Sequence, residues 1–193
     1  MTNKIVLSTD SSDILASNWF QKCVNYLNDA VIVTEAEPTH SPGPRILWAN
    51  DIFYESTGYQ PSEIIGRSPR ILQGPLTDKS VLKRLNTALE NWEVCRVEVL
   101  NYKKDGTTFW NEFEVTPIAD ETGWFTHWIS VQRDVTERRE LEAKIIENEE
   151  RYAHAIKGAN VGIWDLTVAS GSVFLSPIWK SMLGYEEDEV DRK

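Results

Sequence analysis

The short segment 66–78 restricts the local backbone more than any other part of this chain. It reads Gly-Arg-Ser-Pro-Arg-Ile-Leu-Gln-Gly-Pro-Leu-Thr-Asp. Pro69 fixes its own φ and disfavours a helical conformation for the residue before it, and the following Gly-Pro pair ends any helical turn that begins there. Arg70 and Gln73 are three residues apart, and therefore lie on one side of that single turn. We expect a site that directs a cation and an amide at one ligand.

The same segment resembles the signature of the LOV-type PAS domains, which are flavin-binding blue-light sensors. Their signature reads Gly-Arg-Asn-Cys-Arg-Phe-Leu-Gln-Gly-Pro-x-Thr-Asp. Ser68 stands where the family has asparagine, and Pro69 stands where it has the cysteine that forms the photochemical bond to flavin. The resemblance covers residues 29–138. It implies an α+β PAS fold, with an antiparallel sheet and short helices on one face, but without the photoactive cysteine.

The elements predicted from apolar spacing and turn residues have the order of such a fold. Strands are expected at 30–35, 45–49, 95–103, 108–118 and 124–134. Helices are expected at 12–27, just after Asn50, from Ser62 to Gly66, and at 79–89. A further helix follows the last strand, where it would link this domain to what comes next.

The parity of the late strands places polar side chains on apolar faces, because alternate residues of a strand face the same side. Asn101 follows Val97 and Val99 in parity, Asn111 shares a face with Phe113, and Gln132 shares a face with Trp128. A buried amide without a partner costs about 1–3 kcal/mol, so each of these side chains needs hydrogen bonds. The partners are either groups of the domain itself and ordered water, or a planar ligand.

The resemblance assigns a role to these amides. Gln73, Asn101, Asn111 and Gln132 fall at the positions where the LOV motif has its flavin-contacting amides, and Arg70 falls where it has a phosphate-binding arginine. The implied cofactor is FMN or FAD. The second phosphate-binding arginine of the family aligns with Asn86, which implies weaker binding of FMN or a preference for FAD.

Other cofactors are not expected from this sequence. Cys95 shares the parity of Asn101, but six residues of strand separate them by roughly 20 Å, too far to replace the missing thiol. Haem requires an axial ligand, usually histidine, and His127 has the opposite parity to Gln132. We find no metal-ligating cluster and no catalytic site in the chain.

The regions around the domain predict its context. We expect an N-terminal cap helix within 1–28, the LOV-like PAS domain at 29–135, a linker helix at 136–158 and an incomplete second PAS domain at 159–193. The linker carries a short heptad seam: Leu141, Ile145, Asn148, Tyr152 and Ala155. Such a seam suits a dimeric coiled coil, and a solvated linker helix is the alternative. The last region repeats the order of strand, strand, short helix and Gly-Tyr that opens the first domain.

Composition excludes several classes of function. The net charge of -10 argues against nucleic-acid binding, and no apolar run is long enough for membrane insertion. Two cysteines in a helix and a strand suit a reducing, cytoplasmic location.

The sequence thus predicts a sensory PAS module that binds a flavin and relays a redox or light signal through the linker helix to a downstream output domain. We expect a homodimer formed through the N-terminal and linker helices. The alternative is a ligand-free PAS domain that acts as a dimerisation and relay module. In either case the output is expected to be a histidine kinase or a cyclic-di-GMP enzyme (a diguanylate cyclase or phosphodiesterase).

Overall fold

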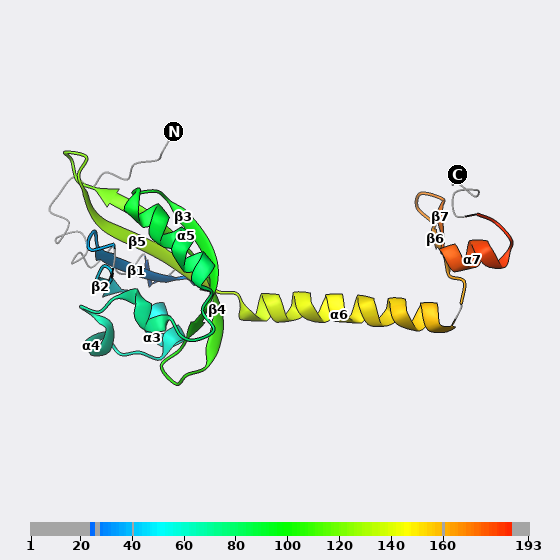
Figure 1. Ribbon diagram of the computed structural model, residues 1–193, viewed down its shortest axis with the longest axis horizontal. Helices are drawn as coiled ribbons and strands as arrows, with labels where there is room; N and C mark the ends of the chain where they lie inside the picture. Colours follow the sequence, from blue (N-terminus) through cyan, green and yellow to red (C-terminus); the bar gives the residue numbers. More distant parts are fainter. Residues whose placement is uncertain (1–23, 26–27, 40, 160, 187–193) are drawn as a thin grey trace. The chain divides into compact units, whose positions relative to one another are not determined.

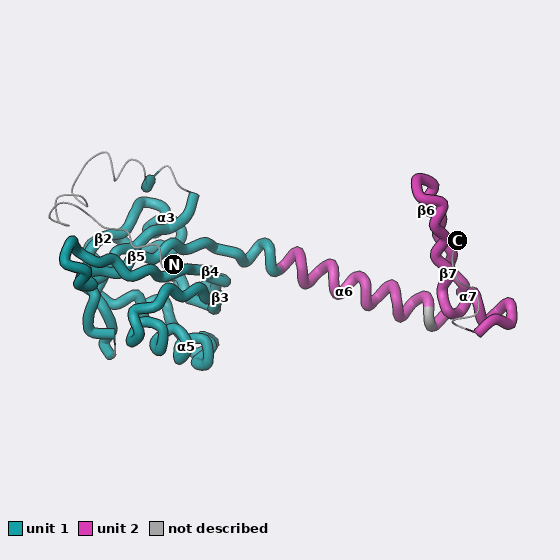
Figure 2. Tube along the Cα trace, turned by 90° about the horizontal axis from the view of Figure 1, so that it is seen from above, with its two compact units in different colours: residues 1–139 teal, residues 140–193 magenta. Residues whose placement is uncertain are grey.

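The computed structural model describes residues 24–25, 28–39, 41–159 and 161–186. The chain divides into two compact units, residues 1–139 and residues 140–193 (Figure 2). The helix expected at 12–27, and the dimer contact expected there, lie outside the described residues except for residues 24–25, which are helical.

The first unit contains a five-stranded antiparallel sheet with the strand order β2-β1-β5-β4-β3 (Figure 1). The strands are β1 (Ala30–Glu35), β2 (Ile46–Ala49), β3 (Cys95–Tyr102), β4 (Thr108–Ala119) and β5 (Phe125–Asp134). Each agrees with the expected strand to within a residue at either end. The sheet and the helices beside it confirm the predicted α+β PAS fold.

Four helices connect β2 to β3 and cover one face of the sheet (Figure 1). They are α3 (Asp51–Thr57), α4 (Pro61–Ile64), the 3-10 turn η1 (Pro69–Leu72) and α5 (Lys79–Glu90). The segment predicted to hold a single helical turn is therefore η1. It begins at Pro69, and the Ser68 hydroxyl accepts a hydrogen bond from the Arg70 amide at 3.4 Å.

Two apolar clusters form the core of this unit. The first joins β1 and β2 to the short helices and includes Ile32, Phe53 and Leu72. The second joins α5 to the other end of the sheet and includes Leu89 and Trp128. Phe53 is fully buried, and removal of such a ring costs about 3–5 kcal/mol. The clusters leave a cavity between them, because residues of both line it.

The helix α6 (Thr136–Ala159) begins in the first unit and continues into the second. It is followed by the hairpin β6 (Trp164–Thr167) and β7 (Ser172–Leu175) and by α7 (Pro177–Met182). This is the order of elements expected for the start of a second PAS domain, and that assignment stays a prediction. Within the described residues, no helix combines the length and apolar composition that a membrane span requires.

Candidate functional site

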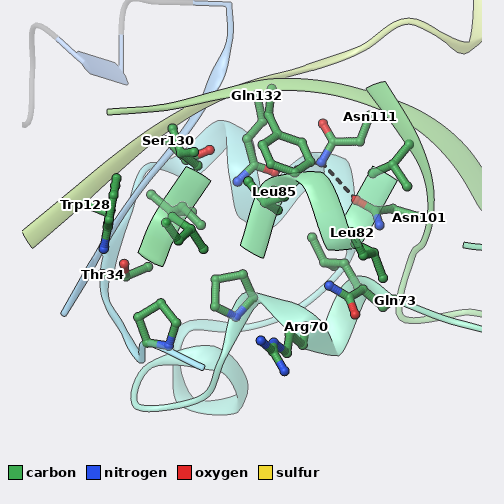
Figure 3. Close-up of a pocket in the computed structure, with 18 of the residues that line it drawn as sticks. Thr34, Arg70, Gln73, Leu82, Leu85, Asn101, Asn111, Trp128, Ser130 and Gln132 are labelled. Carbon is green, nitrogen blue, oxygen red and sulfur yellow. Dashed lines mark hydrogen bonds between the residues drawn. The ribbon is translucent and has the colours of Figure 1, made fainter. Parts of the chain in front are cut away.

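The cavity between the two clusters, here called the central cavity, has a volume of about 90 Å³. Side chains from β1, η1, α5, β3, β4 and β5 line it. The five residues predicted as a site all line it: Arg70, Gln73, Asn101, Asn111 and Gln132. Figure 3 shows Arg70 and Gln73 on one side of the cavity and the three strand amides on the other. Residues far apart in sequence are thus brought together.

The three strand amides form a hydrogen-bonded chain across the sheet. Asn111 Nδ2 donates to Asn101 Oδ1 at 3.0 Å and to Gln132 Oε1 at 2.9 Å. All three side chains are buried. They are diagonal neighbours, because Asn101 pairs with the residue two before Asn111, and Gln132 with the residue two after it. The predicted parity is therefore confirmed, and part of the hydrogen bonding is internal.

One buried polar group in the central cavity has no hydrogen-bond partner among the described residues. The Ser130 hydroxyl is buried, and among the described side chains it is the buried polar atom that makes no hydrogen bond. Buried polar groups are nearly always paired in folded proteins, so this hydroxyl indicates a polar ligand or water in the cavity. A flavin ring, with donors and acceptors along one edge, fits this donor and acceptor set.

Gln73 is held in place by contacts of the segment that follows it. Thr77 Oγ1 accepts from the Gly74 amide at 2.9 Å and donates to the Leu100 carbonyl on β3 at 2.8 Å. The Leu76 amide donates to the Tyr102 hydroxyl at 3.0 Å. These bonds attach the end of η1 to β3, and they fix the direction from which Gln73 enters the cavity.

Arg70 is half-buried at the edge of the central cavity. Its Nη2 donates to the Thr39 carbonyl at 3.2 Å and to Asn86 Oδ1 on α5 at 3.4 Å. Gly43 passes close to it, since a Cβ at Gly43 would lie 3.0 Å from Arg70 Nε. Among the described residues that line the cavity, Arg70 is the one cation. Asn86, which is expected to align with the family's second arginine, thus contacts Arg70 without adding a charge.

Pro69, Cys95 and His127 differ in their position relative to the central cavity. Pro69 lines the central cavity, whereas the buried Cys95 is not among the lining residues. His127 does not line the cavity either, and burial lowers the pKa of its imidazole although Glu35 opposes this. No group of side chains suited to a metal ion occurs in the described part of the chain.

Sequence reasoning missed several residues of this site. Ser130, Thr34 and the apolar side chains of Leu82 and Leu85 on α5 line the central cavity. Ser130 was detectable, because it shares the parity of Trp128 and Gln132 on β5. The face of α5 that reaches the cavity follows only from the packing of that helix on the sheet.

The start of α6 is attached to the opposite face of β3 and β4. The Val135 amide donates to the Trp110 carbonyl at 2.8 Å, and the Trp110 amide donates to Thr136 Oγ1 at 2.8 Å. The Arg139 guanidinium lies 3.8 Å from the centre of the Trp110 ring. Trp110 directly precedes Asn111, so one short stretch of β4 contacts both the cavity and the helix.

Two carboxylates complete this attachment. Arg138 Nη2 lies 3.1 Å from Glu98 Oε2 and 3.7 Å from Glu112 Oε1, and Arg139 Nε lies 2.8 Å from Glu98 Oε1. A hydrogen bond from Arg96, together with the nearby positive charges, lowers the pKa of Glu112. We call Trp110, Glu98, Glu112, Arg138 and Arg139 the helix anchor.

Comparison with curated proteins finds blue-light-activated histidine kinases among the relatives of this chain. A blue-light-activated histidine kinase of Brucella anthropi is 31% identical over 184 residues, which cover 90% of this chain and 37% of that protein. The blue-light-activated histidine kinase of Brucella canis is 28% identical over 185 residues, with the same two shares. The chain therefore spans little more than a third of the length of these relatives.

Solved structures with a similar fold are LOV domains. A light-oxygen-voltage domain studied with a flavin analogue has a TM-score of 0.57 and 31% identity, and the match covers 72% of this chain and 98% of that one. The light-state LOV domain of Aureochrome1 has a TM-score of 0.54 and 33% identity, over 67% and 97%. The sequence model of the PAS domain matches residues 28–137, more than half of the chain. The chain therefore belongs to the PAS domain family, and its structural neighbours in that family are LOV domains.

Proposed function

We propose that the first unit holds a flavin in the central cavity and relays a redox or light signal through α6 to an output domain. The observation that carries this proposal is the convergence of Arg70, Gln73, Asn101, Asn111 and Gln132 on one cavity. The unpaired Ser130 hydroxyl in the same cavity supports it. The similarity to LOV domains and to blue-light-activated histidine kinases agrees with it.

Each of the five predicted site residues has a role in this proposal. Asn101, Asn111 and Gln132 would bind the polar edge of the ring, since an amide can donate and accept. Gln73 would bind the ring from the η1 side, and Arg70 would pair with a phosphate. A bound flavin supplies blue-light absorption and reversible redox chemistry. The central cavity is smaller than the roughly 300–1,000 Å³ of most small-molecule sites, so its side chains must move apart around the ring.

Gln132 connects the central cavity to the helix anchor. Its side chain can donate a hydrogen bond through Nε2 or accept one through Oε1. If a ring atom of the flavin gains a proton, that atom changes from acceptor to donor, and Gln132 must then turn its Oε1 toward the ring. Gln132 lies four residues before the first residue of α6, and its partner Asn111 is adjacent to Trp110 in the helix anchor. Reorientation of this amide would thus disturb the strand ends to which α6 is attached.

A second candidate function is a ligand-free PAS domain used for dimerisation and relay. It is favoured by the hydrogen bonds among the three strand amides, which already satisfy part of their polar groups. In either case we propose a cytoplasmic homodimer with α6 at its interface. We propose a histidine kinase as the output domain, because the relatives are blue-light-activated histidine kinases.

Titration of the flavin-free protein with FMN and riboflavin tests the proposal. Loss of one ligand hydrogen bond weakens binding by about tenfold for each 1.4 kcal/mol, so we expect Gln73→Leu and Asn111→Leu to raise both Kd values by at least that factor. Arg70→Ala should weaken the binding of FMN and leave riboflavin unchanged, because only FMN carries a phosphate. Asn86→Arg should strengthen FMN binding.

Glu114→Gln is the matched control, because Glu114 is exposed and lies on the opposite face of β4. Its Kd values should equal those of the wild type. If neither the wild type nor any variant binds FMN or riboflavin, the ligand-free alternative is favoured. Equal binding by all variants would place the flavin outside the central cavity.

A further inference from the structure

Three aromatic rings form a continuous stack beside the central cavity. The Trp92 and Trp128 rings have centroids 5.2 Å apart and planes 2° apart. The Trp92 and Phe125 rings have centroids 4.9 Å apart and planes 12° apart. Trp128 is only 2% exposed and lines the central cavity, whereas Trp92 does not line it.

The other end of the stack is at the surface. Trp92 and Phe125 line a separate groove of about 410 Å³, together with parts of the 36–37 and 123–126 segments. The stack therefore connects a surface groove to the buried cavity. Figure 3 shows the Trp128 ring at the cavity wall.

The backbone of Trp92 is strained. Its φ is 56°, in the left-handed region, just after the C-terminus of α5. Glycine is the usual residue at such a position, and any other residue there costs about 1–2 kcal/mol. A strained backbone persists only where the surroundings enforce it, and such sites are frequently functional. The indole ring of Trp92 is therefore held at a backbone position that bulky side chains rarely adopt.

We propose that Trp92 and Trp128 form an electron relay between soluble reductants and a flavin in the central cavity. The inference rests on the proposed function, because it needs a flavin as the acceptor. Indole is among the most easily oxidised of the uncharged side chains, and the two rings overlap nearly in parallel. Phe125 is not readily oxidised, so its role is to hold Trp92 in the stack. Pro69 offers no thiol to the flavin, so electron transfer replaces bond formation as the event that light drives.

The electrons balance with a soluble thiol as the donor. In each passage, Trp128 would give one electron to a light-excited flavin, and Trp92 would give one electron to the oxidised Trp128. A thiolate at the groove would then give one electron to the oxidised Trp92. Two such passages would supply the two electrons of full flavin reduction, the flavin would take its protons from water, and the two thiyl radicals would combine to a disulfide. Trp128 Nε1 donates its hydrogen bond to the Ala36 carbonyl at 3.0 Å. A carbonyl is too weak a base to take that proton, so the positive charge moves on to Trp92.

The rate of light-driven bleaching of the bound flavin, measured without oxygen and with dithiothreitol as the thiol, tests this relay. Flavin content is first measured for each protein by release on denaturation. We expect Trp92→Phe and Trp128→Phe to bleach more slowly by roughly tenfold. Trp92→Tyr, which keeps an oxidisable ring, should recover part of the rate.

Trp110→Phe is the matched control and should bleach at the wild-type rate. Trp110 is on the opposite face of β4, and the Arg139 cation above its ring opposes oxidation. A second readout needs no flavin, because two stacked indoles couple and give a pair of bands in far-ultraviolet circular dichroism. That pair of bands should be lost from Trp92→Phe and Trp128→Phe and kept in Trp110→Phe.

The outcomes separate the relay from the proposed function. If the wild type and Trp92→Phe both bind flavin and the bound flavin bleaches equally fast in the two proteins, the relay alone is overturned. A wild type that binds no flavin overturns both. Slower bleaching of the two stack variants, with full flavin content and an unaffected Trp110→Phe, supports the relay.

Discussion

Asn111 joins three strands at the centre of the site, because its Nδ2 group serves acceptors on both β3 and β5. Strand parity predicts that Asn101, Asn111 and Gln132 face the apolar side, and this holds in the structure. Parity does not predict which amide bonds to which, because that depends on register. The register places the three residues diagonally rather than directly opposite one another.

Replacement of Asn111 by leucine should destabilise the flavin-free protein. The Oδ1 of Asn101 and the Oε1 of Gln132 would lose their shared donor while buried, which costs about 1–3 kcal/mol. We expect the free energy of unfolding, measured by urea denaturation, to fall by that amount. Glu114→Ala, at an exposed position, should change it by less than about 0.5 kcal/mol. Equal stabilities of the two variants would contradict the internal amide chain.

Pro69 lines the central cavity, and we predict that it stands at the position of the family's photoactive cysteine. The substitution Pro69→Cys supplies a nucleophile at the start of η1. With flavin bound in the family's pose, blue light should bleach the visible band of this variant, and the band should return in the dark. The wild type without a reductant should not bleach in this way. A variant that binds flavin and never bleaches would show that the pose differs from that of the family.

At the scale of elements, α6 is joined to the sheet through the helix anchor rather than through apolar packing. Apart from Thr136, its residues up to 155 are exposed. Each exposed ion pair contributes about 0.2–1 kcal/mol and the cation–π contact about 0.5–1 kcal/mol. The attachment is therefore weak enough to respond to small changes in β4. The linker helix was predictable from sequence, but its anchor was not, because the partners Glu98 and Glu112 lie on other elements.

The helix anchor should depend on pH through Glu112. Its pKa in the folded protein is lowered chiefly by the hydrogen bond from Arg96. The pairing therefore contributes stability above the unfolded Glu pKa of about 4.3, and this is lost as the pH falls through the lower folded value. An NMR titration of the Glu112 carboxyl carbon should give a midpoint below that of Arg96→Ala. Identical midpoints in the two proteins would contradict the role of Arg96.

The exposed seam of α6 predicts self-association. Leu141, Ile145 and Tyr152 are 53%, 58% and 70% exposed. If Asn148 lies in a coiled-coil seam, Asn148→Leu should strengthen the dimer and loosen its register, because a buried Asn trades stability for specificity. Sedimentation should show tighter association than the wild type. The control Glu150→Leu, opposite the seam, should not. An unchanged dimer affinity for Asn148→Leu would leave α6 as a solvated linker.

At the scale of the whole molecule, the order of elements was predictable because turns and apolar periods are local in sequence. Arg70 and Gln73 of segment 66–78 line the central cavity, so the expectation that they share one cavity is met, whereas their binding role stays a prediction. The aromatic stack was not predictable. It joins Trp92 after α5 to Phe125 and Trp128 on β5, and only packing brings these residues together.

The visible absorption spectrum of the purified protein tests the central claim most directly. We expect the absorption bands of a bound flavin, and denaturation should release about one FMN or FAD per chain, in line with a single site of the kind proposed. The wild type and Asn111→Leu are both purified from cells grown with riboflavin and are compared. The variant should carry less flavin. A colourless wild type that takes up neither FMN nor FAD on addition would contradict the account.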